Sequence, residues 1–391
     1  MAIVALCIDA LLPALDIIGR DIGVTELSDN QLLITMIFLG LGIGSLFFGP
    51  LSDSLGRKPI VFMGIALFIV ASFICIYSDS LEMMIVGRIL QGVALSAPRT
   101  ISIAIVRDSY SGDYMARIMS FITVIFILVP IIAPALGKVV LNYYNWHAIF
   151  YIQIGFSVFV LFWFWKRQPE TLLKPNRIRF SASVFIDGTK ELLKFKTTIG
   201  YTLISGFITG SFMLYLSTSQ QIFVQQYKLT DEFPYIFAGL AISIGIATFL
   251  NGTLVLKYGM KRLVTIAMIG FLCVSLLYVV LFYGKPNPSI TILLIFFAMQ
   301  FFAIGFLFGN LRSLAMNPVG HIAGIAAAVT GFTSTIMAVP LSAFVGKFVI
   351  DTSLPLFIGF SVFGMLSILI LFYLRRVTAK KNPDPTLEAI K

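Results

Sequence analysis

Apolar stretches long enough to cross a membrane recur along almost the whole chain. A hydrocarbon layer ~30 Å thick requires about 20 apolar residues in a helix. Of the 391 residues, 58% are hydrophobic and only 12% are charged, whereas soluble proteins carry about 25% charged residues. The chain therefore lacks the charge to cover a water-facing surface. The sequence predicts a polytopic membrane protein and disfavours soluble enzymes, nucleic-acid binders and secreted disulfide scaffolds.

Polar, proline and glycine interruptions divide the apolar sequence into twelve segments. The first six are residues 2–19, 31–51, 59–77, 83–105, 116–137 and 147–165. The second six are residues 198–223, 234–256, 263–283, 289–311, 322–346 and 354–374. These lengths suit membrane helices, because strands of a membrane barrel would be only ~10 residues long. We expect an all-α protein with twelve transmembrane helices.

The basic residues indicate how these helices are oriented. Of the 28 Lys and Arg residues, 21 lie on one side of the spans, five on the other, and two inside a span. Cytoplasmic loops collect Lys and Arg, so we expect both termini and the central loop to be cytoplasmic. The first apolar run begins at Met1 without a basic leader. We interpret it as a retained span, trimmed at its start, rather than a cleaved signal peptide.

The polar stretch 166–197 separates two sets of six spans, 1–165 and 198–374, and a tail, 375–391, follows. A loop motif is repeated in the two halves at an offset of 203 residues. It runs from Gly49 to Lys58 in the first half and from Gly252 to Arg262 in the second. Both copies have two glycines seven residues apart and end with a basic pair. Transporters built from such repeats carry their site at the interface of the halves.

Asp9 is the one carboxylate clearly in the middle of a span. An ionised Asp at the bilayer centre costs roughly 2.5–3.5 kcal/mol, so such a residue is a functional candidate by default. We expect it to load and release a proton. Asp16 lies seven residues further on, on the same helix face and about 10.5 Å along the axis. For Asp16 a bond to a neighbouring helix is the favoured interpretation, and for Asp9 it is the alternative.

Two arginines, Arg88 and Arg99, lie in the fourth span. Eleven residues place them within about 20° of one face and roughly 16.5 Å apart. Guanidinium groups in a membrane helix must face a polar cavity or a partner, so we expect the fourth span to line the pathway. Arg99 could bind an anionic substrate or offset Asp9, and snorkelling to the interface is the alternative.

In the second half, neutral polar residues in the spans are possible cavity groups, although ordinary interhelical bonding is as good an explanation. They include Tyr215, Gln220 and Asn310. A large apolar cavity with one acid suits lipophilic cationic or neutral compounds. The three cysteines and two histidines are too scattered for a metal site. No phosphate-binding loop is recognisable, so we expect no cofactor, and protons as the coupling ion.

Four stretches of sequence resemble the major facilitator superfamily, and in particular its drug:proton antiporters. The run Gly49 to Lys58 resembles the family's loop 2-3 signature, and Arg88-Ile-Leu-Gln91-Gly92 is similar to the Arg-x-x-Gln-Gly motif of the antiporters. Pro130-Ile-Ile-Ala-Pro134-Ala-Leu-Gly137 resembles their antiporter motif. Asp9-Ala-Leu-Leu-Pro13-Ala-Leu resembles the first span of the bicyclomycin and chloramphenicol (Bcr/CflA-type) exporters.

The resemblance implies two six-helix bundles, a monomer in a bacterial inner membrane, and proton-coupled efflux of lipophilic molecules by alternating access. It implies that Arg88 and Gln91 help the coupling proton move. It also implies that the two prolines and the glycine of the antiporter motif form a bent, tightly packed hinge. The loop residues would form a gate rather than a binding site. These are Gly49, Asp53, Gly56, Arg57 and Lys58 together with Asp108, with which Arg57 is expected to pair.

Three alternatives remain open from the sequence. The first is export of a specific metabolite or siderophore on the same scaffold. The second is a membrane receptor or scaffold without transport activity, which would not need an acid in the middle of the membrane. The third and weakest is a membrane enzyme, because no nucleophile, base and orienting group occur together on the spans.

Overall fold

The computed structural model describes residues 2–110, 112–177 and 182–381, and the regular structure in these ranges is helical. The first half contains α1 (Ala2–Asp9), α2 (Leu15–Asp21), α3 (Leu32–Leu55), α4 (Arg57–Ile76), α5 (Leu81–Ser109), α6 (Gly112–Tyr143) and α7 (His147–Arg167). The second contains α8 (Ala182–Leu192), α9 (Lys196–Gln220), α10 (Phe233–Tyr258), α11 (Met260–Phe282), α12 (Ile290–Met316), α13 (Ala323–Gly346) and α14 (Leu354–Lys381). Five short helical segments join them, η1 (Leu12–Ala14), η2 (Leu27–Gln31), η3 (Lys174–Asn176), the π-helical η4 (Gln221–Gln226) and η5 (Asn317–Ile322).

Eleven helical segments of the described chain are long and apolar enough to cross a membrane. Helix α6 adds a shorter apolar stretch, Leu128–Tyr143. The prediction of an all-α, multi-pass membrane protein is confirmed. Several helices continue past the expected spans, because polar residues mark the membrane boundary but do not end the helical hydrogen bonding. One consequence is that Arg312, expected in a loop, lies inside α12.

The first span is broken in its middle. Helix α1 ends at Asp9, and one 3-10 turn, η1, leads into α2. Pro13 lies in this turn and has no N–H to donate, so it removes one helical hydrogen bond at the break. The break places Asp9 at the end of a helix rather than within one.

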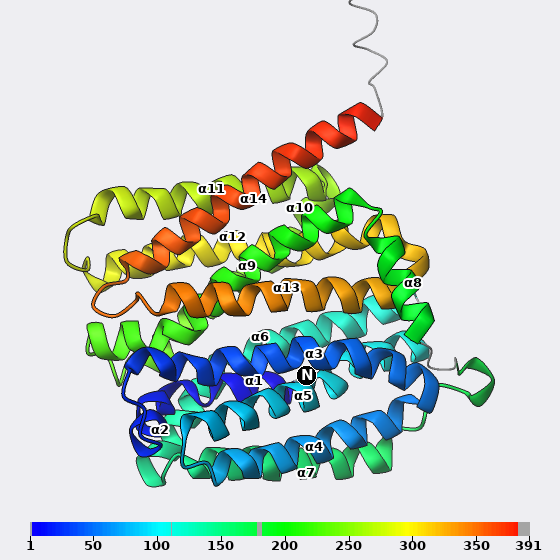
Figure 1. The fold of residues 1–391 in the computed structure, drawn as a ribbon, viewed down its shortest axis with the longest axis horizontal. Coiled ribbons are helices and arrows are strands. Elements are labelled where there is room, and N and C mark those ends of the chain that lie inside the picture. The colour runs from blue at the N-terminus through cyan, green and yellow to red at the C-terminus, as the bar shows by residue number, and fades with distance from the viewer. Residues whose placement is uncertain (1, 111, 178–181, 382–391) are drawn as a thin grey trace, which may run out of the picture.

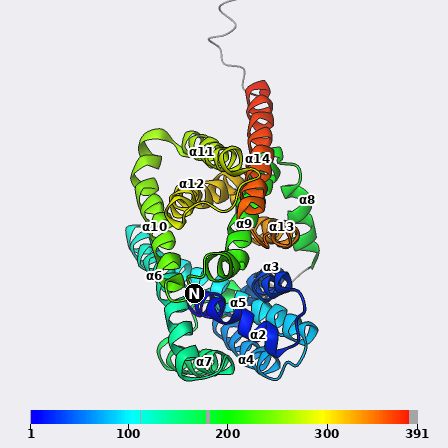
Figure 2. The same ribbon diagram turned by 90° about the vertical axis from the view of Figure 1, so that its left-hand side faces the viewer.

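The spanning helices form two groups, which lie one above the other in Figure 1 and remain separate in the end-on view of Figure 2. We call α1–α7 the N-terminal lobe and α9–α14 the C-terminal lobe. Within the N-terminal lobe α5 packs on α3 and α4, and within the C-terminal lobe α9 packs on α12, α13 and α14. Between the lobes, α3 packs on α13 and α6 on α10.

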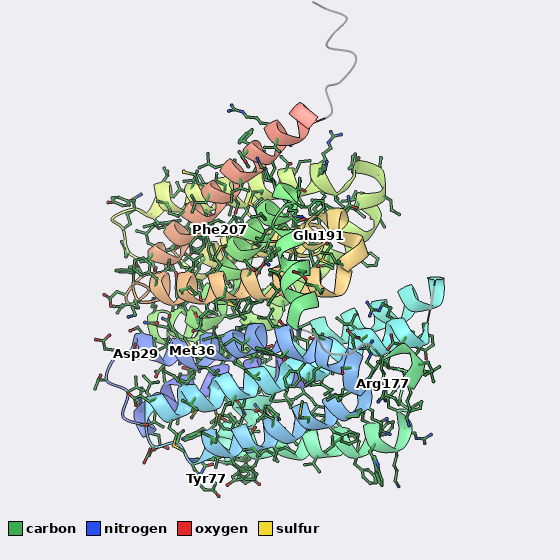
Figure 3. All side chains as sticks on the ribbon, turned by 45° about the vertical axis from the view of Figure 1, so that its right-hand side comes forward. Asp29, Met36, Tyr77, Arg177, Glu191 and Phe207 are labelled. Atoms are coloured by element: carbon green, nitrogen blue, oxygen red, sulfur yellow. The ribbon has the colours of Figure 1, made fainter. Side chains whose placement is uncertain are left out.

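The two ends of the helices differ in their loops. We call one the basic end, which carries the turns at Gly56 and Gly259 and the segments 168–177 and 182–195. The opposite end carries η2, the turn after α4 and the π-helix η4. In Figure 3, Asp29 and Tyr77 lie at the opposite end of the molecule and Arg177 at the basic end.

Helices α3 and α5 come into direct backbone contact. Gly40 of α3 lies against the backbone of Ile89 and Gly92, and Gly92 lies in turn against the backbone of Ile37. A Cβ at either glycine would overlap a carbonyl oxygen of the other helix. Small residues allow this close approach in membrane helices. The contact fixes α5, which carries Arg88 and Gln91, against α3.

The repeated loop motif forms the same turn in both lobes. Gly56 joins α3 to α4 with φ 111°, and Gly259 joins α10 to α11 with φ 75°. Residues with a Cβ rarely adopt such positive φ values, and glycine does so readily. The two glycines are 203 residues apart, which is the offset of the repeat.

Candidate functional site

Asp9 lies at the end of α1, within the first span, and is only 4% exposed. No hydrogen bond or ion pair joins its carboxylate to any residue that the structure describes. Buried carboxylates are normally paired. The Asp9 carboxyl is therefore free to bind a proton or a cationic ligand group, which is the property that a coupling site requires.

One polar group of the other lobe on which the charge of Asp9 acts is Tyr215 of α9. Its side chain is 2% exposed, its hydroxyl has no hydrogen-bond partner, and the negative charge of Asp9 acts on it. The Tyr215 ring packs edge to face with two rings of α12. The distance between ring centroids is 4.5 Å to Phe301 and 5.2 Å to Phe297. It also stacks with Phe237 at 6.0 Å. An unpaired acid of one lobe thus lies near an unpaired phenol and an aromatic cluster of the other.

Arg88 is fully buried and binds backbone and amide oxygens. Its Nε donates to the Leu33 carbonyl at 2.7 Å, and its Nη1 donates to Gln91 Oε1 at 2.8 Å. Both terminal nitrogens lie 3.4 Å from the Cys7 carbonyl. Gln91 in turn donates to Ser72 at 2.8 Å. Arg88 and Gln91 therefore tie α1, α3, α4 and α5 together, and Arg88 contacts the helix of Asp9 two residues before the acid.

The antiporter motif also lies beside Asp9. Pro130 and Pro134 are both within α6, which continues through them. Gly137 packs against the backbone of Ala10, the residue after Asp9, so closely that a Cβ there would overlap the Ala10 carbonyl. The motif supports the broken part of the first span.

Asp16 contributes to a polar connection between the lobes at the opposite end. It accepts hydrogen bonds from Gln220 at 2.6 Å and from Gln225 at 2.8 Å, both in the C-terminal lobe. Asn30 donates to it at 3.4 Å. Asp16 is thus bonded to neighbouring helices, the interpretation that the sequence favoured, and Gln220 is its partner.

Three further contacts reinforce this connection and were not expected from the sequence. Gln31 donates to Gln221 at 2.9 Å and to the Gly346 carbonyl at 3.1 Å. Lys138 forms an ion pair with Asp231 at 2.6 Å. The cluster of amide side chains in and before η4 was the only sequence signal for this region.

The loop Gly49–Lys58, which the sequence predicts to be a gate, is organised around Arg57, which is 3% exposed. Its Nε lies 2.9 Å from Asp108, the expected pair, and its Nη1 lies 2.5 Å from Asp53 and 2.8 Å from Ser52. Lys58 donates to the Trp165 carbonyl at 2.9 Å. The loop therefore connects α3, α4, α5 and α7, all within the N-terminal lobe.

Glu170 completes this loop and was not identified from the sequence. Its carboxylate accepts from the backbone N–H groups of Arg57 at 2.9 Å and Lys58 at 3.0 Å, at the first turn of α4, and from Leu172 at 3.0 Å. A carboxylate is stabilised at a helix N-terminus. Partial burial would raise the pKa of Glu170, but these three donors and the charge of Arg177 outweigh it and hold the pKa below its ordinary value.

The remaining candidates lie away from Asp9. Arg99 is exposed on α5, and the charged group that acts on it is Arg312 of α12. Asn310 is 3% exposed and bonds Asn251 at 2.7 Å, so it joins α12 to α10 inside the C-terminal lobe.

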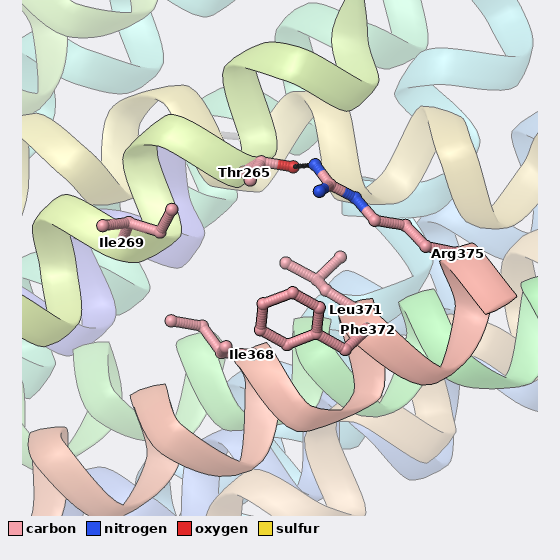
Figure 4. A pocket seen from close by; sticks show the side chains of 6 residues that line it. All are labelled: Thr265, Ile269, Ile368, Leu371, Phe372 and Arg375. Atoms are coloured by element: carbon pink, nitrogen blue, oxygen red, sulfur yellow. Dashed lines mark hydrogen bonds between the residues drawn. The ribbon is translucent and has the colours of Figure 1, made fainter.

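A surface pocket lies between α11 and α14 and contains no acid. Figure 4 shows that its one charged group, Arg375, donates to Thr265, at 2.9 Å. The lining residues are Thr265, Ile269, Ile368, Leu371, Phe372 and Arg375. The exposed side chains of Ile269 and Phe372 mark it as part of the apolar outer surface.

The fold and the unpaired acid beside the other lobe define a helical membrane transport protein. The family model described as Major Facilitator Superfamily matches residues 1–342. The chain belongs to the Major Facilitator Superfamily and is a transporter, not an enzyme. The expected family is confirmed.

Two curated relatives cover nearly the whole chain. The Bicyclomycin resistance protein homolog of Haemophilus influenzae is 27% identical over 385 residues, which is 94% of this chain and 92% of that protein. Multidrug resistance protein MdtL of Klebsiella pneumoniae is 24% identical over 370 residues, 93% of this chain and 91% of that protein. Among solved structures, the xylose transporter XylE from E. coli superposes with a TM-score of 0.71 at 13% identity, covering 96% of this chain and 95% of XylE.

Proposed function

We propose that the protein exports lipophilic small molecules from the cytoplasm in exchange for protons, by alternating access of a site between its two lobes. The observation that carries the proposal is the Asp9 carboxyl, which is buried in the first span, near the other lobe, and unpaired in the described structure. A structural acid would be expected to have a hydrogen-bond donor or a cation beside it.

The coupling follows from the cost of an uncompensated charge in the membrane. An ionised Asp at the bilayer centre costs about 2.5–3.5 kcal/mol. Either a proton on Asp9 or a cationic substrate group beside it removes that cost, so the two compete for the same carboxyl. A neutral substrate would compete by donating a hydrogen bond to the ionised carboxylate, which favours the charged form, and Tyr215, whose hydroxyl is unpaired, offers it a second polar contact.

Arg88 and Gln91 would position Asp9 rather than exchange protons with substrate. Their hydrogen bonds reach the Cys7 carbonyl, the Leu33 carbonyl and Ser72. Through the Cys7 carbonyl, Arg88 holds the end of α1 in place two residues before the acid.

Alternation requires the lobes to separate at one end and close at the other. At the opposite end they are joined by hydrogen bonds from Gln220 and Gln225 to Asp16 and by those of Gln31. Water can replace these bonds at modest cost. We place the basic end in the cytoplasm of a bacterial inner membrane, because cytoplasmic loops collect Lys and Arg. On this orientation the described contacts close the periplasmic end.

The substrate class rests on the site and on the relatives. Tyr215 and the phenylalanines around it are buried against one another in this structure. Parting of the lobes would present this aromatic surface to lipophilic cations and neutral aromatic compounds. The printed names of the two curated relatives refer to resistance to bicyclomycin and to multiple drugs. Both lobes that form the site belong to one chain, so we propose the monomer as the transport unit.

The test is transport by purified protein in liposomes with an acidic lumen. Wild-type protein should accumulate tetraphenylphosphonium and chloramphenicol in the lumen, and collapse of the gradient should release them. Asp9→Asn should abolish accumulation, whereas Asp79→Asn, the same change at an exposed loop residue, should not. Undiminished gradient-driven accumulation by Asp9→Asn would refute the proposed role of Asp9.

A further inference from the structure

The basic end of the C-terminal lobe carries positive charge without acids of its own. Residues 233–350 and 352–383 contain no Asp or Glu. The three acids of this lobe lie in or beside loops of the opposite end, and they are Asp231, Glu232 and Asp351. Exposed basic residues at the basic end include Lys257, Lys261, Arg262, Arg375 and Arg376. Like charges repel one another, so this surface is suited to an anion from outside the chain.

The N-terminal lobe differs at the corresponding loop. There, Arg57 is paired with Asp53 and Asp108. In the second copy of the loop motif, Leu256 stands where the first copy has Asp53, and the Leu256 side chain is 89% exposed. The second copy therefore keeps its basic pair and lacks the acid. Exposed cations beside an exposed leucine are typical of contact with an anionic membrane surface.

Helix α8 is the other source of acids at this end. It carries Asp187 and Glu191. However, α8 packs on α13, and Asp187 pairs with Lys190 of the same helix at 4.0 Å. The counter-charge for α11 and α14 is therefore still to be supplied.

The pocket between α11 and α14 is a groove with a cation at one end and apolar walls beyond it. Arg375 donates to the Thr265 hydroxyl at 2.9 Å, and Figure 4 shows Ile269 and Ile368 at the other end of the groove. Ile269 follows Thr265 by about one turn of α11, and Ile368 precedes Arg375 by about two turns of α14. Helix α11 begins at the basic end and α14 ends there, so the apolar walls lie toward the middle of the membrane. Ile269 is 48% exposed and Phe372 is 58% exposed. A phospholipid has the same polarity, with its charge at the surface and its chains inward.

The Arg375 guanidinium can bind a phosphate without breaking its present contact. Thr265 accepts one hydrogen bond from it, and no other residue that the structure describes does so. Guanidinium groups bind phosphate oxygens through two parallel hydrogen bonds. A second cation lies close by, because the Thr265 hydroxyl donates to the backbone carbonyl of exposed Lys261 at 2.8 Å.

We infer that this groove binds an anionic phospholipid, with the lipid phosphate on Arg375 and Lys261. One acyl chain lies along Ile269, Ile368 and Phe372. The lipid supplies the counter-charge that the N-terminal lobe obtains from its own acids. A zwitterionic lipid carries its own cation and therefore binds less tightly. Basic pockets between membrane helices on the cytoplasmic side suit anionic headgroups. The place of this lipid in the cytoplasmic leaflet rests on the proposed orientation, but its binding requires neither transport nor Asp9.

The test is native mass spectrometry of the purified full chain in detergent, titrated with dioleoyl phosphatidylglycerol or dioleoyl phosphatidylcholine. Wild type should bind the first phosphatidylglycerol severalfold more tightly than the first phosphatidylcholine. Glycerol 3-phosphate at the same concentration should not displace the bound phosphatidylglycerol, because it lacks the chains that the groove holds. Equal affinity for the two lipids would overturn the anionic site, and displacement by glycerol 3-phosphate would overturn a lipid as its occupant.

Variants locate the site. Arg375→Gln should reduce the affinity for phosphatidylglycerol severalfold and leave that for phosphatidylcholine unchanged, which also shows that the variant is folded. Arg167→Gln makes the same change at an exposed residue of α7, at the basic end of the N-terminal lobe, and should retain the preference. Thr265→Val removes the hydrogen bond but keeps the charge, so it should also retain the preference.

Two results would overturn the assignment to the groove. Equal losses of affinity in Arg375→Gln and Arg167→Gln would show that the lipid responds to overall charge. A loss in Thr265→Val as large as that in Arg375→Gln would show that the local structure, not the cation, determines binding. Because no gradient is present, these results are independent of the transport test on Asp9.

Discussion

Removal of one charge at a time around Arg57 should show that its contact with Asp108, not its contact with Asp53, holds the loop Gly49–Lys58 together. Both carboxylates pair with Arg57, but the Asp108 side chain is 16% exposed and that of Asp53 is 44% exposed. A hydrogen bond to a charged group in a partly buried site contributes about 1.5–3 kcal/mol. An ion pair exposed to water contributes about 0–1 kcal/mol. Asp108 also receives a hydrogen bond from Thr171 at 3.4 Å.

We therefore expect Asp108→Asn to lower the free energy of unfolding by about 2 kcal/mol and Asp53→Asn by less than about 1 kcal/mol. The measurement is reversible unfolding in bicelles by titration with sodium dodecyl sulfate, followed by circular dichroism. The Asp79→Asn variant controls for removal of an acid from an exposed loop. If Asp53→Asn lowered the free energy of unfolding as much as Asp108→Asn or more, burial would not determine which of the two contacts contributes more to stability.

Two further predictions concern the N-terminal lobe. Gly40→Ala should reduce the yield of monodisperse protein in size-exclusion chromatography, because its Cβ would overlap the Ile89 carbonyl. Gly49→Ala should not, because its Cβ would have only one neighbouring atom, 4.0 Å away on Thr100, and equal yields would contradict the close contact. The second prediction is a pH dependence. Folding depresses the pKa of Glu170. The contribution of Glu170 to stability is therefore fully present above its ordinary pKa of 4.5 and is lost as the pH falls through its pKa in the folded state. The difference in stability between wild type and Glu170→Gln should be constant from neutral pH down to the ordinary pKa of Glu170 and should then shrink. A difference that grows on acidification would contradict the stabilisation of the first turn of α4 by the Glu170 carboxylate.

Local pattern was sufficient to predict the spans and the contact between Arg57 and Asp108. Apolar length determines which segments can cross a membrane, and the repeat of Gly56 at Gly259 follows from the positive φ that each turn requires. Arg57 and Asp108 could be paired because both lie where a helix meets the basic end. Asp9 could be singled out because a lone acid in a span is costly wherever its helix packs.

Contacts that depend on how distant segments meet were not accessible from one sequence. Glu170 lies in a polar loop whose composition does not indicate that it returns to the first turn of α4. Arg312 was assigned to a basic loop, because apolar character fades before α12 ends. The bonds from Gln225 and Gln220 to Asp16 depend on the register in which the two lobes meet, and no local pattern determines that register.

The central claim is that Asp9 gives up its proton when cargo binds. Proton release can be counted by isothermal titration of tetraphenylphosphonium into the purified protein, in buffers that differ in ionisation enthalpy. Wild type near neutral pH should release protons on binding, so the observed heat should vary with the buffer, and Asp9→Asn should bind without this variation. Proton release from Asp9→Asn equal to that of wild type would show that another group carries the coupling proton.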